Sequence, residues 1–240
     1  MYMTPVMMTK RFEAFRRTKF YDLFAAAPLI AWYAFCAAHL IPSVSRQVAL
    51  VKLFVQTDPS ALPMVLILRT CANVTTLIFL AILIVLFVVR YVPQRTMLQL
   101  RARCVAVAGA FLSVSILLLP PQELSSSLYV ISLVLIISGT IFAIYAGLVL
   151  GRSISILPEA RRLVTRGPYA FVRHPLYLGE IVAVIGVALQ FLSIWALLIV
   201  GLQFVLQLLR MNYEERVLSQ VFPEYQNYIA RTARLMPGVY

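Results

Sequence analysis

The chain has 240 residues, of which 62% are hydrophobic and 12% charged, and its mean hydropathy is +0.89. A soluble globular domain carries about a quarter charged residues, so the composition excludes that class and indicates an integral membrane protein. The formal net charge of +12 does not indicate a nucleic-acid-binding protein, because no soluble segment carries a stripe of basic and aromatic residues.

Five long apolar runs predict membrane-spanning α-helices. Each is near or above the roughly 18 to 20 residues that cross a bilayer as a helix. An isolated strand would leave backbone polar groups unpaired in lipid, and the runs lack the alternation of a membrane barrel. The runs cover residues 22–41, 63–89, 104–119, 128–150 and 177–209.

The connections between the runs carry little chemistry. Residues 42–62 are mixed in character, and they predict either an amphipathic segment on the outer surface or a plain loop. Residues 120–127 predict a turn. Cys36, Cys71 and Cys104 lack the spacing of metal ligands, so we expect neither a disulfide nor a zinc site.

The fifth run is too long for a single span. Its 33 residues would extend about 50 Å as one helix, against a hydrocarbon core of about 30 Å. Polar and interfacial residues at 190–195 can turn the chain at the far surface. We therefore predict a helical hairpin, six membrane helices in all, and one all-α polytopic domain over residues 1–240.

The basic residues predict the orientation of these helices. Eighteen of the 21 lysines and arginines fall in segments on one side of the predicted spans, including residues 10–19 and 152–173. The positive-inside rule then places both termini in the cytoplasm. The positive charge is explained by this orientation and by contact with anionic lipid, so no nucleic acid is expected as a partner.

Two charged motifs meet if the hairpin forms. Residues 173–179 read Arg-His-Pro-Leu-Tyr-Leu-Gly and precede the hairpin, and Glu214 and Glu215 follow it. Taken singly, such residues also suit ordinary helix ends and interfacial anchors. Together, an arginine, a histidine, a tyrosine and two carboxylates predict a cytoplasmic site for a small zwitterionic ligand.

The same residues carry a family resemblance. Gly-Pro-Tyr at 167–169, the motif at 173–179 and the pair Glu214-Glu215 resemble the isoprenylcysteine carboxyl methyltransferases and the related phospholipid methyltransferases. The resemblance covers residues 139–240, and residues 1–127 match no family that we can name. It implies an enzyme of the cell inner membrane that uses S-adenosylmethionine, with its site facing the cytoplasm and no metal.

The resemblance also implies how the residues would hold this cofactor. Glu214 and Glu215 could neutralise the α-ammonium or hold ribose hydroxyls, while Arg173 or His174 could bind the α-carboxylate. Tyr169 and Tyr177 offer rings and hydroxyls for the adenine or the sulfonium.

Two further residues of the motif are expected to shape the site. Pro175 would start a helix whose free amides favour an anionic group. Gly179, one turn later, would allow close approach of the ligand or of another backbone. Glycines at 139, 147 and 151 predict close helix packing.

Glu180 and Arg210 are the candidate catalytic residues. Glu180 falls inside the apolar hairpin, where a carboxylate is costly unless it faces a partner or a wet cavity. It could pair with an arginine or help to deprotonate the substrate, or it could lie shallow enough to reach the interface. Arg210 could orient an anionic substrate, a prediction that rests on its location alone.

The predicted reaction is methyl transfer to a carboxylate or amine of a lipidic or amphipathic substrate within the membrane. Two alternatives remain open. Membrane sterol reductases look somewhat similar in the C-terminal half and use NADPH, and a non-catalytic scaffold or small transporter would also be polytopic. The sequence does not identify the methyl acceptor.

Overall fold

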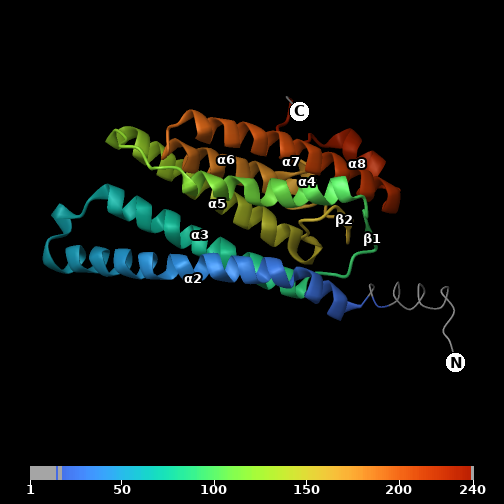
Figure 1. Cartoon of the computed structure of the whole chain (residues 1–240), viewed down its shortest axis with the longest axis horizontal. Helices are drawn as coiled ribbons and strands as arrows, with labels where there is room; N and C mark the ends of the chain where they lie inside the picture. The colour runs from blue at the N-terminus through green and yellow to red at the C-terminus, as the bar shows by residue number, and fades with distance from the viewer. Residues whose placement is uncertain (1–14, 16–17, 239–240) are drawn as a thin grey trace.

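The computed structural model describes residue 15 and residues 18–238, which form a bundle of long, roughly parallel or antiparallel helices (Figure 1). The α-helices are α2 (Lys19–Thr57), α3 (Met64–Val89), α4 (Leu100–Phe111), α5 (Ser126–Leu150), α6 (Pro175–Leu189), α7 (Ile194–Val221) and α8 (Tyr225–Arg231). Short 3-10 helices are η1 (Pro59–Ala61), η2 (Leu112–Leu118), η3 (Gly151–Ser153) and η4 (Gly167–Ala170). Strands β1 (Arg95–Thr96) and β2 (Glu159–Ala160) pair antiparallel.

The all-α polytopic class is confirmed. Within the described residues, five helical segments are long and apolar enough to cross a membrane: α2, α3, α4 with η2, α5 with η3, and α7. Helix α6 is also apolar but has only 15 residues. The predicted turn before α5 is present, and the Ser125 hydroxyl caps that helix by accepting from the Leu128 amide.

The prediction for residues 42–62 was wrong, because α2 continues through Pro42 and ends only at Thr57. Instead of lying on the surface or forming a loop, this segment extends along α3. Buried Gln47 supports the pairing, since its side-chain oxygen accepts a hydrogen bond of 3.0 Å from Asn73 on α3. Gln47, a polar residue of this segment, thus bonds across the two helices.

The helical hairpin at the end of the chain is confirmed. Helix α6 ends at Leu189, and α7 begins at Ile194, where the Ser193 hydroxyl accepts from the Ala196 amide at 3.1 Å. Helix α7 runs further than the apolar pattern predicted. Glu214 and Glu215 consequently lie within α7 and not beyond its end.

Helices α5 and α6 pack with their backbones in contact. A Cβ added to Gly139 would lie 2.5 Å from the Ala183 nitrogen and 2.7 Å from the Gly179 oxygen. A Cβ on Gly179 would lie 2.7 Å from the Ala143 nitrogen. Only glycine fits at either position, so the packing predicted for Gly139 is confirmed.

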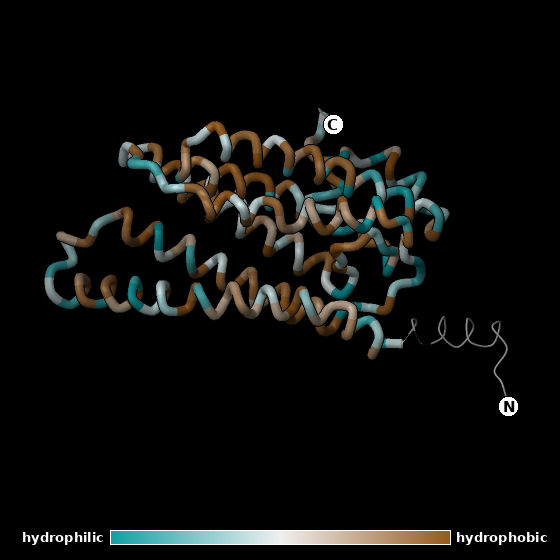
Figure 2. The backbone as a smooth tube through the Cα atoms, in the orientation of Figure 1, coloured by the Kyte–Doolittle hydropathy of each residue, from teal (hydrophilic) through white to brown (hydrophobic). Residues whose placement is uncertain are grey.

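Polar residues gather at one end of the bundle. Hydrophilic positions dominate the end that holds β1, β2 and α8, whereas the helical shafts are mostly apolar (Figure 2). The start of α2 lies at this same end, and the C-terminus lies over α7 (Figure 1). The predicted basic segment 10–19 lies largely outside the described residues, as do residues 239–240.

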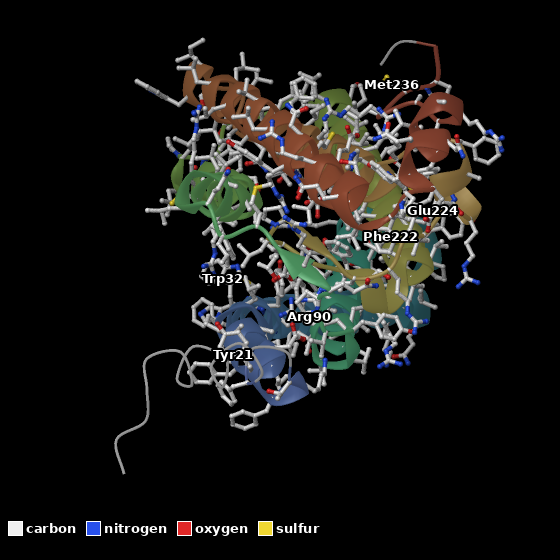
Figure 3. All side chains as sticks on the ribbon, turned by 90° about the vertical axis from the view of Figure 1, so that its right-hand side faces the viewer. Tyr21, Trp32, Arg90, Phe222, Glu224 and Met236 are labelled. Atoms are coloured by element: carbon white, nitrogen blue, oxygen red, sulfur yellow. The ribbon has the colours of Figure 1, made fainter. Side chains whose placement is uncertain are left out.

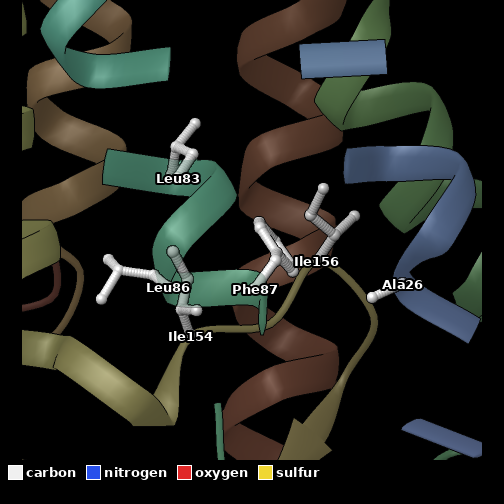
Figure 4. Packing of buried hydrophobic residues seen from close by; sticks show 6 residues of the cluster. All are labelled: Ala26, Leu83, Leu86, Phe87, Ile154 and Ile156. Atoms are coloured by element: carbon white, nitrogen blue, oxygen red, sulfur yellow. The ribbon is translucent and has the colours of Figure 1, made fainter. Parts of the chain in front are cut away.

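A cluster of buried apolar residues fixes the segment after α5 against the first helical hairpin. It joins α2, α3 and the chain at 154–156 (Figure 4), and its members are Ala26, Leu83, Leu86, Phe87, Ile154 and Ile156. Figure 3 looks onto the polar end, with Tyr21 and Arg90 on the α2–α3 side and Phe222 and Glu224 on the α7–α8 side. The cluster thereby holds residues 153–164 at the polar end of the bundle.

Candidate active site

A cavity opens at the polar end, between the first helical hairpin and the C-terminal helices. Its walls come from α2, α3, residues 153–164, η4, α6, α7 and α8. Titratable and aromatic side chains supply much of the lining, namely Tyr33, Phe87, Glu159, Arg161, Arg162, Tyr169, Arg173, His174, Tyr177, Glu180, Arg210, Glu214, Tyr225 and Tyr228.

Most of the residues singled out from the sequence meet at this cavity. Seven of the ten line it: Tyr169, Arg173, His174, Tyr177, Glu180, Arg210 and Glu214. The other three residues do not line the cavity but lie next to lining residues. Pro175 is the first residue of α6, Gly179 packs against α5, and Glu215 contacts the lining residues from outside.

Glu215 holds the Arg-His motif and the C-terminal segment together. Its Oε1 accepts from Arg173 Nε at 3.0 Å and from Arg234 Nε at 3.2 Å, and it lies 3.0 Å from His174 Nε2. Arg173 Nη1 also donates to the backbone carbonyls of Ile229 and Thr232, at 3.2 and 2.5 Å. Glu215 is therefore occupied by protein groups, and its contacts position Arg173 and His174.

Glu214 has a different environment, although it is the next residue in the chain. Successive side chains on a helix point about 100° apart, so Glu214 faces the cavity. Its Oε1 accepts a hydrogen bond from the Tyr177 hydroxyl. Among the described residues, no lysine, arginine or histidine forms an ion pair with Glu214, which leaves its charge available to a cationic ligand.

The Tyr177 ring contacts the side chains of His174 and Arg210. His174 stacks on it with the ring centroids 5.5 Å apart and the planes 12° apart, and the Arg210 guanidinium carbon lies 4.8 Å from its centroid. Because the ring is fixed, its hydroxyl is directed at Glu214.

Glu180 is linked to Arg210 through a glutamine. Gln207 Nε2 donates to Glu180 Oε2 at 3.1 Å, and Gln207 Oε1 accepts from Arg210 Nη1 at 2.9 Å. The direct arginine pair expected as one possibility is absent from the described residues, and Gln207 bridges the two charges instead. Gln207 was not predicted, although a buried glutamine within an apolar helix is itself a signal of a polar partner.

Two aromatic residues close the cavity from the C-terminal side. The Tyr228 hydroxyl donates to the Tyr169 carbonyl at 2.7 Å. Burial raises the pKa of Tyr228 to about 12, and the nearby Glu215 charge acts in the same direction. Burial also raises the pKa of Tyr169, whose buried hydroxyl has no hydrogen-bond partner in the described part of the chain. Tyr169 therefore presents an unused, protonated hydroxyl near the cavity.

The sequence did not single out Arg161, which also lines the cavity. Its side chain is buried, and its Nη2 lies 2.9 Å from Asp22 Oδ1 and 2.6 Å from Glu159 Oε2. Asp22 lies 139 positions earlier in the chain, so no local pattern could have revealed the pairing.

A second, apolar groove runs between α6 and α7 within the membrane-spanning part. Its lining is Glu180, Ile181, Val184, Ile185, Val200, Gly201, Gln203, Phe204 and Gln207. Glu180 lines both the groove and the cavity. Glu180 therefore lies between the two spaces, where an apolar chain and a polar ligand could approach each other.

Metal coordination finds no support in the part of the chain that the structure describes. No group of three or more histidine, cysteine, aspartate or glutamate side chains gathers there in a way that could hold an ion.

Two curated proteins are similar to part of this chain. The nickel-cobalt-cadmium resistance protein NccN of Alcaligenes xylosoxydans xylosoxydans is 36% identical over 80 residues, which are 33% of this chain and 38% of that protein. The cobalt-zinc-cadmium resistance protein CzcN of Cupriavidus metallidurans is 34% identical over 76 residues, 31% of this chain and 35% of that protein. The matched parts thus span little more than a third of either relative.

A family comparison covers the part of the chain that builds most of the cavity. Residues 124–225 match the model of the family described as phospholipid methyltransferase. The match includes α5, η4, α6 and α7, and with them all ten residues singled out from the sequence. The family recognised from the motifs is thereby confirmed by the match of residues 124–225 to the phospholipid methyltransferase model.

Proposed function

We propose that this membrane methyltransferase uses S-adenosylmethionine and methylates the polar group of a lipidic substrate. The observation that carries the proposal is the convergence of the family motifs on one cavity, where Tyr177 of α6 donates to Glu214 of α7. Residues 37 positions apart meet there only because the last two helices form a hairpin.

The chemistry of the lining fits this cofactor. S-adenosylmethionine carries two cationic groups, a carboxylate and an aromatic base. Glu180 and Glu214 supply two carboxylates that no lysine, arginine or histidine of the described chain pairs with directly. Tyr169 supplies an unpartnered buried hydroxyl for hydrogen bonding to polar atoms of the cofactor, and Tyr177 supplies a ring.

The residues have separate roles in this proposal. Glu214 binds the ammonium or a ribose hydroxyl, and the Tyr177 hydrogen bond fixes its orientation. Arg173 and His174 form a wall that Glu215 keeps in place. When bound, the cofactor supplies a methyl group and loses its sulfonium charge, so a cavity with little water favours transfer.

The groove between α6 and α7 supports a lipidic substrate. An apolar tail in this groove would have its polar end near Glu180, where groove and cavity meet. A carboxylate acceptor would need no general base, whereas an ammonium acceptor must lose a proton first. We propose Glu180 as the group that takes that proton, with Gln207 and Arg210 holding it in place.

The orientation in the membrane is also part of the proposal. The cavity lies at the polar end of the bundle, where hydrophilic positions gather (Figure 2). Basic residues such as Arg90, Arg161 and Arg173 lie at this end. By the positive-inside rule this end faces the cytoplasm, and we propose the cell inner membrane as its location.

Calorimetry on the purified protein in detergent tests the cofactor. We expect saturable binding of S-adenosylmethionine and none of NADPH. Glu214→Gln should weaken that binding by about tenfold or more, since it removes a charge-assisted contact. Glu123→Gln, an exposed substitution in the loop before α5, is the matched control and should leave binding unchanged.

Binding of NADPH alone would favour the reductase alternative, and binding of neither nucleotide would favour a scaffold or transporter. If S-adenosylmethionine binds, mass spectrometry of membrane extracts incubated with a labelled methyl donor identifies the acceptor.

The names of the two relatives suggest a physiological setting. Both are named for resistance to metals, so we propose that the methylated product supports growth on media containing cobalt or cadmium. A strain lacking the gene, complemented with the wild-type chain or with Glu214→Gln, tests this; equal growth of the two complemented strains would contradict it.

A further inference from the structure

Arg161 is a buried arginine that uses only part of its hydrogen-bonding capacity. It follows β2 directly, and both of its ionic contacts, to Asp22 and to Glu159, are made by Nη2. Its Nε and Nη1 are buried and have no hydrogen-bond partner among the described residues. A guanidinium has five N–H donors and stays charged in proteins, so three of these donors, one on Nε and two on Nη1, are unused.

The surrounding charges do not balance. Asp22 also pairs with Arg90 at 3.0 Å and with Lys19 at 3.4 Å. Within the described chain, three cationic side chains therefore share the two carboxylates of Asp22 and Glu159. A buried charged donor without a partner costs more than a typical hydrogen bond contributes, and an anion arriving at Arg161 would remove that cost.

The other basic side chains of the cavity have fewer unused donors than Arg161, or they are exposed. Arg173 donates to Glu215 and to two backbone carbonyls. Arg210 donates to Gln207 and to the carbonyls of Gly109 and Ile156, so that among its nitrogens only Nε has no partner in the described chain. His174 contacts Glu215. Arg162 is exposed, with its guanidinium carbon 4.0 Å from the centroid of the Tyr91 ring. Arg161 thus combines burial, unused donors and a place in the cavity wall.

We infer that Arg161 binds the anionic group of the ligand, a carboxylate or a phosphate, in the part of the cavity lined by residues 153–164. This inference rests on the proposed function and deepens it. In this arrangement Glu180 and Glu214 face the cationic groups of the ligand, and Arg161 faces its anionic group. This inference differs from the sequence-based prediction that Arg173 or His174 binds the anion, since Glu215 already contacts both of those side chains.

Calorimetry with Arg161→Lys tests the inference. Lysine keeps one positive charge that can face Asp22 but removes the Nε and Nη1 donors. If Arg161 binds the carboxylate of S-adenosylmethionine, its Kd should rise about 10- to 100-fold, and the Kd of decarboxylated S-adenosylmethionine should stay within about twofold of wild type.

A second pair of probes identifies an anion that belongs to the acceptor. Dioctanoyl phosphatidic acid carries a phosphate, and dioctanoylglycerol lacks it. Weaker binding of the phosphatidic acid alone, with unchanged affinity for S-adenosylmethionine, would support the inference and assign the anion to the lipid.

Two variants separate ligand binding from a structural role. Arg166→Lys makes the same substitution at an exposed arginine outside the cavity lining and should leave all affinities unchanged. Asp22→Asn breaks the ion pair from the other side, so it should lower the thermal stability as Arg161→Lys does, yet retain anion affinity.

Equal loss of affinity in Asp22→Asn and Arg161→Lys would overturn the inference, as would wild-type affinity of Arg161→Lys for all four probes. Failure of the wild-type chain to bind S-adenosylmethionine would instead contradict the proposed function.

Discussion

Glu215 should stabilise the C-terminal segment, and the substitution Glu215→Gln should loosen it. One carboxylate oxygen of Glu215 accepts hydrogen bonds from Arg173 Nε at 3.0 Å and from Arg234 Nε at 3.2 Å. The same oxygen lies 3.0 Å from His174 Nε2. The backbone supports the same junction, because the Arg173 amide donates to the Ala233 carbonyl at 2.9 Å. Glu215 therefore joins the loop before α6 to the segment after α8.

The magnitude follows from the three contacts. Hydrogen bonds to charged groups contribute about 1.5 to 3 kcal/mol each, and neutral ones about 0.5 to 1.5 kcal/mol. Glutamine retains an acceptor oxygen but loses the charge, so each contact weakens by about 1 kcal/mol. The Glu215 side chain is 16% exposed, and contacts on one atom are not additive, so we expect about 2 kcal/mol in total.

Hydrogen exchange measures this loss locally. About 2 kcal/mol corresponds to a roughly 30-fold larger population of the open segment. The amides of Arg173, His174 and Ala233 should therefore exchange faster in Glu215→Gln. Glu214→Gln is the matched control, since it should weaken cofactor binding and leave these rates unchanged. Equal exchange in the two variants would refute the separation of roles.

Three further predictions concern the groove, the helix packing and the C-terminal tyrosine. Gly201→Leu should fill the groove without disturbing the fold, because a Cβ there meets nothing within 4 Å. Incorporation of labelled methyl into extracted lipid should fall, while the affinity for S-adenosylmethionine is retained. Unchanged labelling would show that the groove does not bind the substrate. Gly179→Ala brings a Cβ to 2.8 Å from the Gly139 oxygen, so it should cost about 1 to 3 kcal/mol and lower the thermal midpoint in detergent, whereas Gly201→Ala should not. Tyr228→Phe removes the 2.7 Å hydrogen bond to the Tyr169 carbonyl and should lower the free energy of unfolding by about 1 kcal/mol. Since burial raises the pKa of Tyr228 to about 12, the folded state keeps a proton that the unfolded state releases near pH 10. That contribution should be constant from pH 7 to 9 and be lost as the pH rises from about 10 to 12, and a difference between wild type and variant that changes below pH 9 would contradict it.

Hydrophobicity and length were enough to predict the class and the hairpin, but not all helix ends. The apolar run at 177–209 was too long for one span, and its length predicted the turn that lies between Leu189 and Ile194. The prediction for residues 42–62 failed because their polar side chains suggested a segment on the membrane surface or a loop, whereas helix α2 continues to Thr57. Gln47 instead bonds to Asn73 on the neighbouring helix, and hydropathy cannot tell a polar residue in water from one bonded between helices.

The candidate site could be predicted where its residues share a motif or lie close in the chain. The motif placed Arg173, His174 and Tyr177 together, but it could not assign different roles to Glu214 and Glu215. That difference arises from the rotation between successive residues of α7 and from Arg234, which arrives from the C-terminal segment. Arg161 was counted as one basic residue among many, because its partner Asp22 belongs to the first helix.

The short length of α6 explains how a soluble cofactor and a lipid could meet. Its 15 residues span about 22 Å, less than the ~30 Å hydrocarbon core. With the α6–α7 turn at the far surface, the start of α6 would lie about 8 Å inside the near lipid boundary. Arg173 and His174 would then lie just below the lipid head groups, and Glu180 about 8 Å deeper along the helix. A substrate could then present its polar group to the cavity while its tail remained in the groove and the bilayer, so that no lipid need leave the membrane for the methyl transfer.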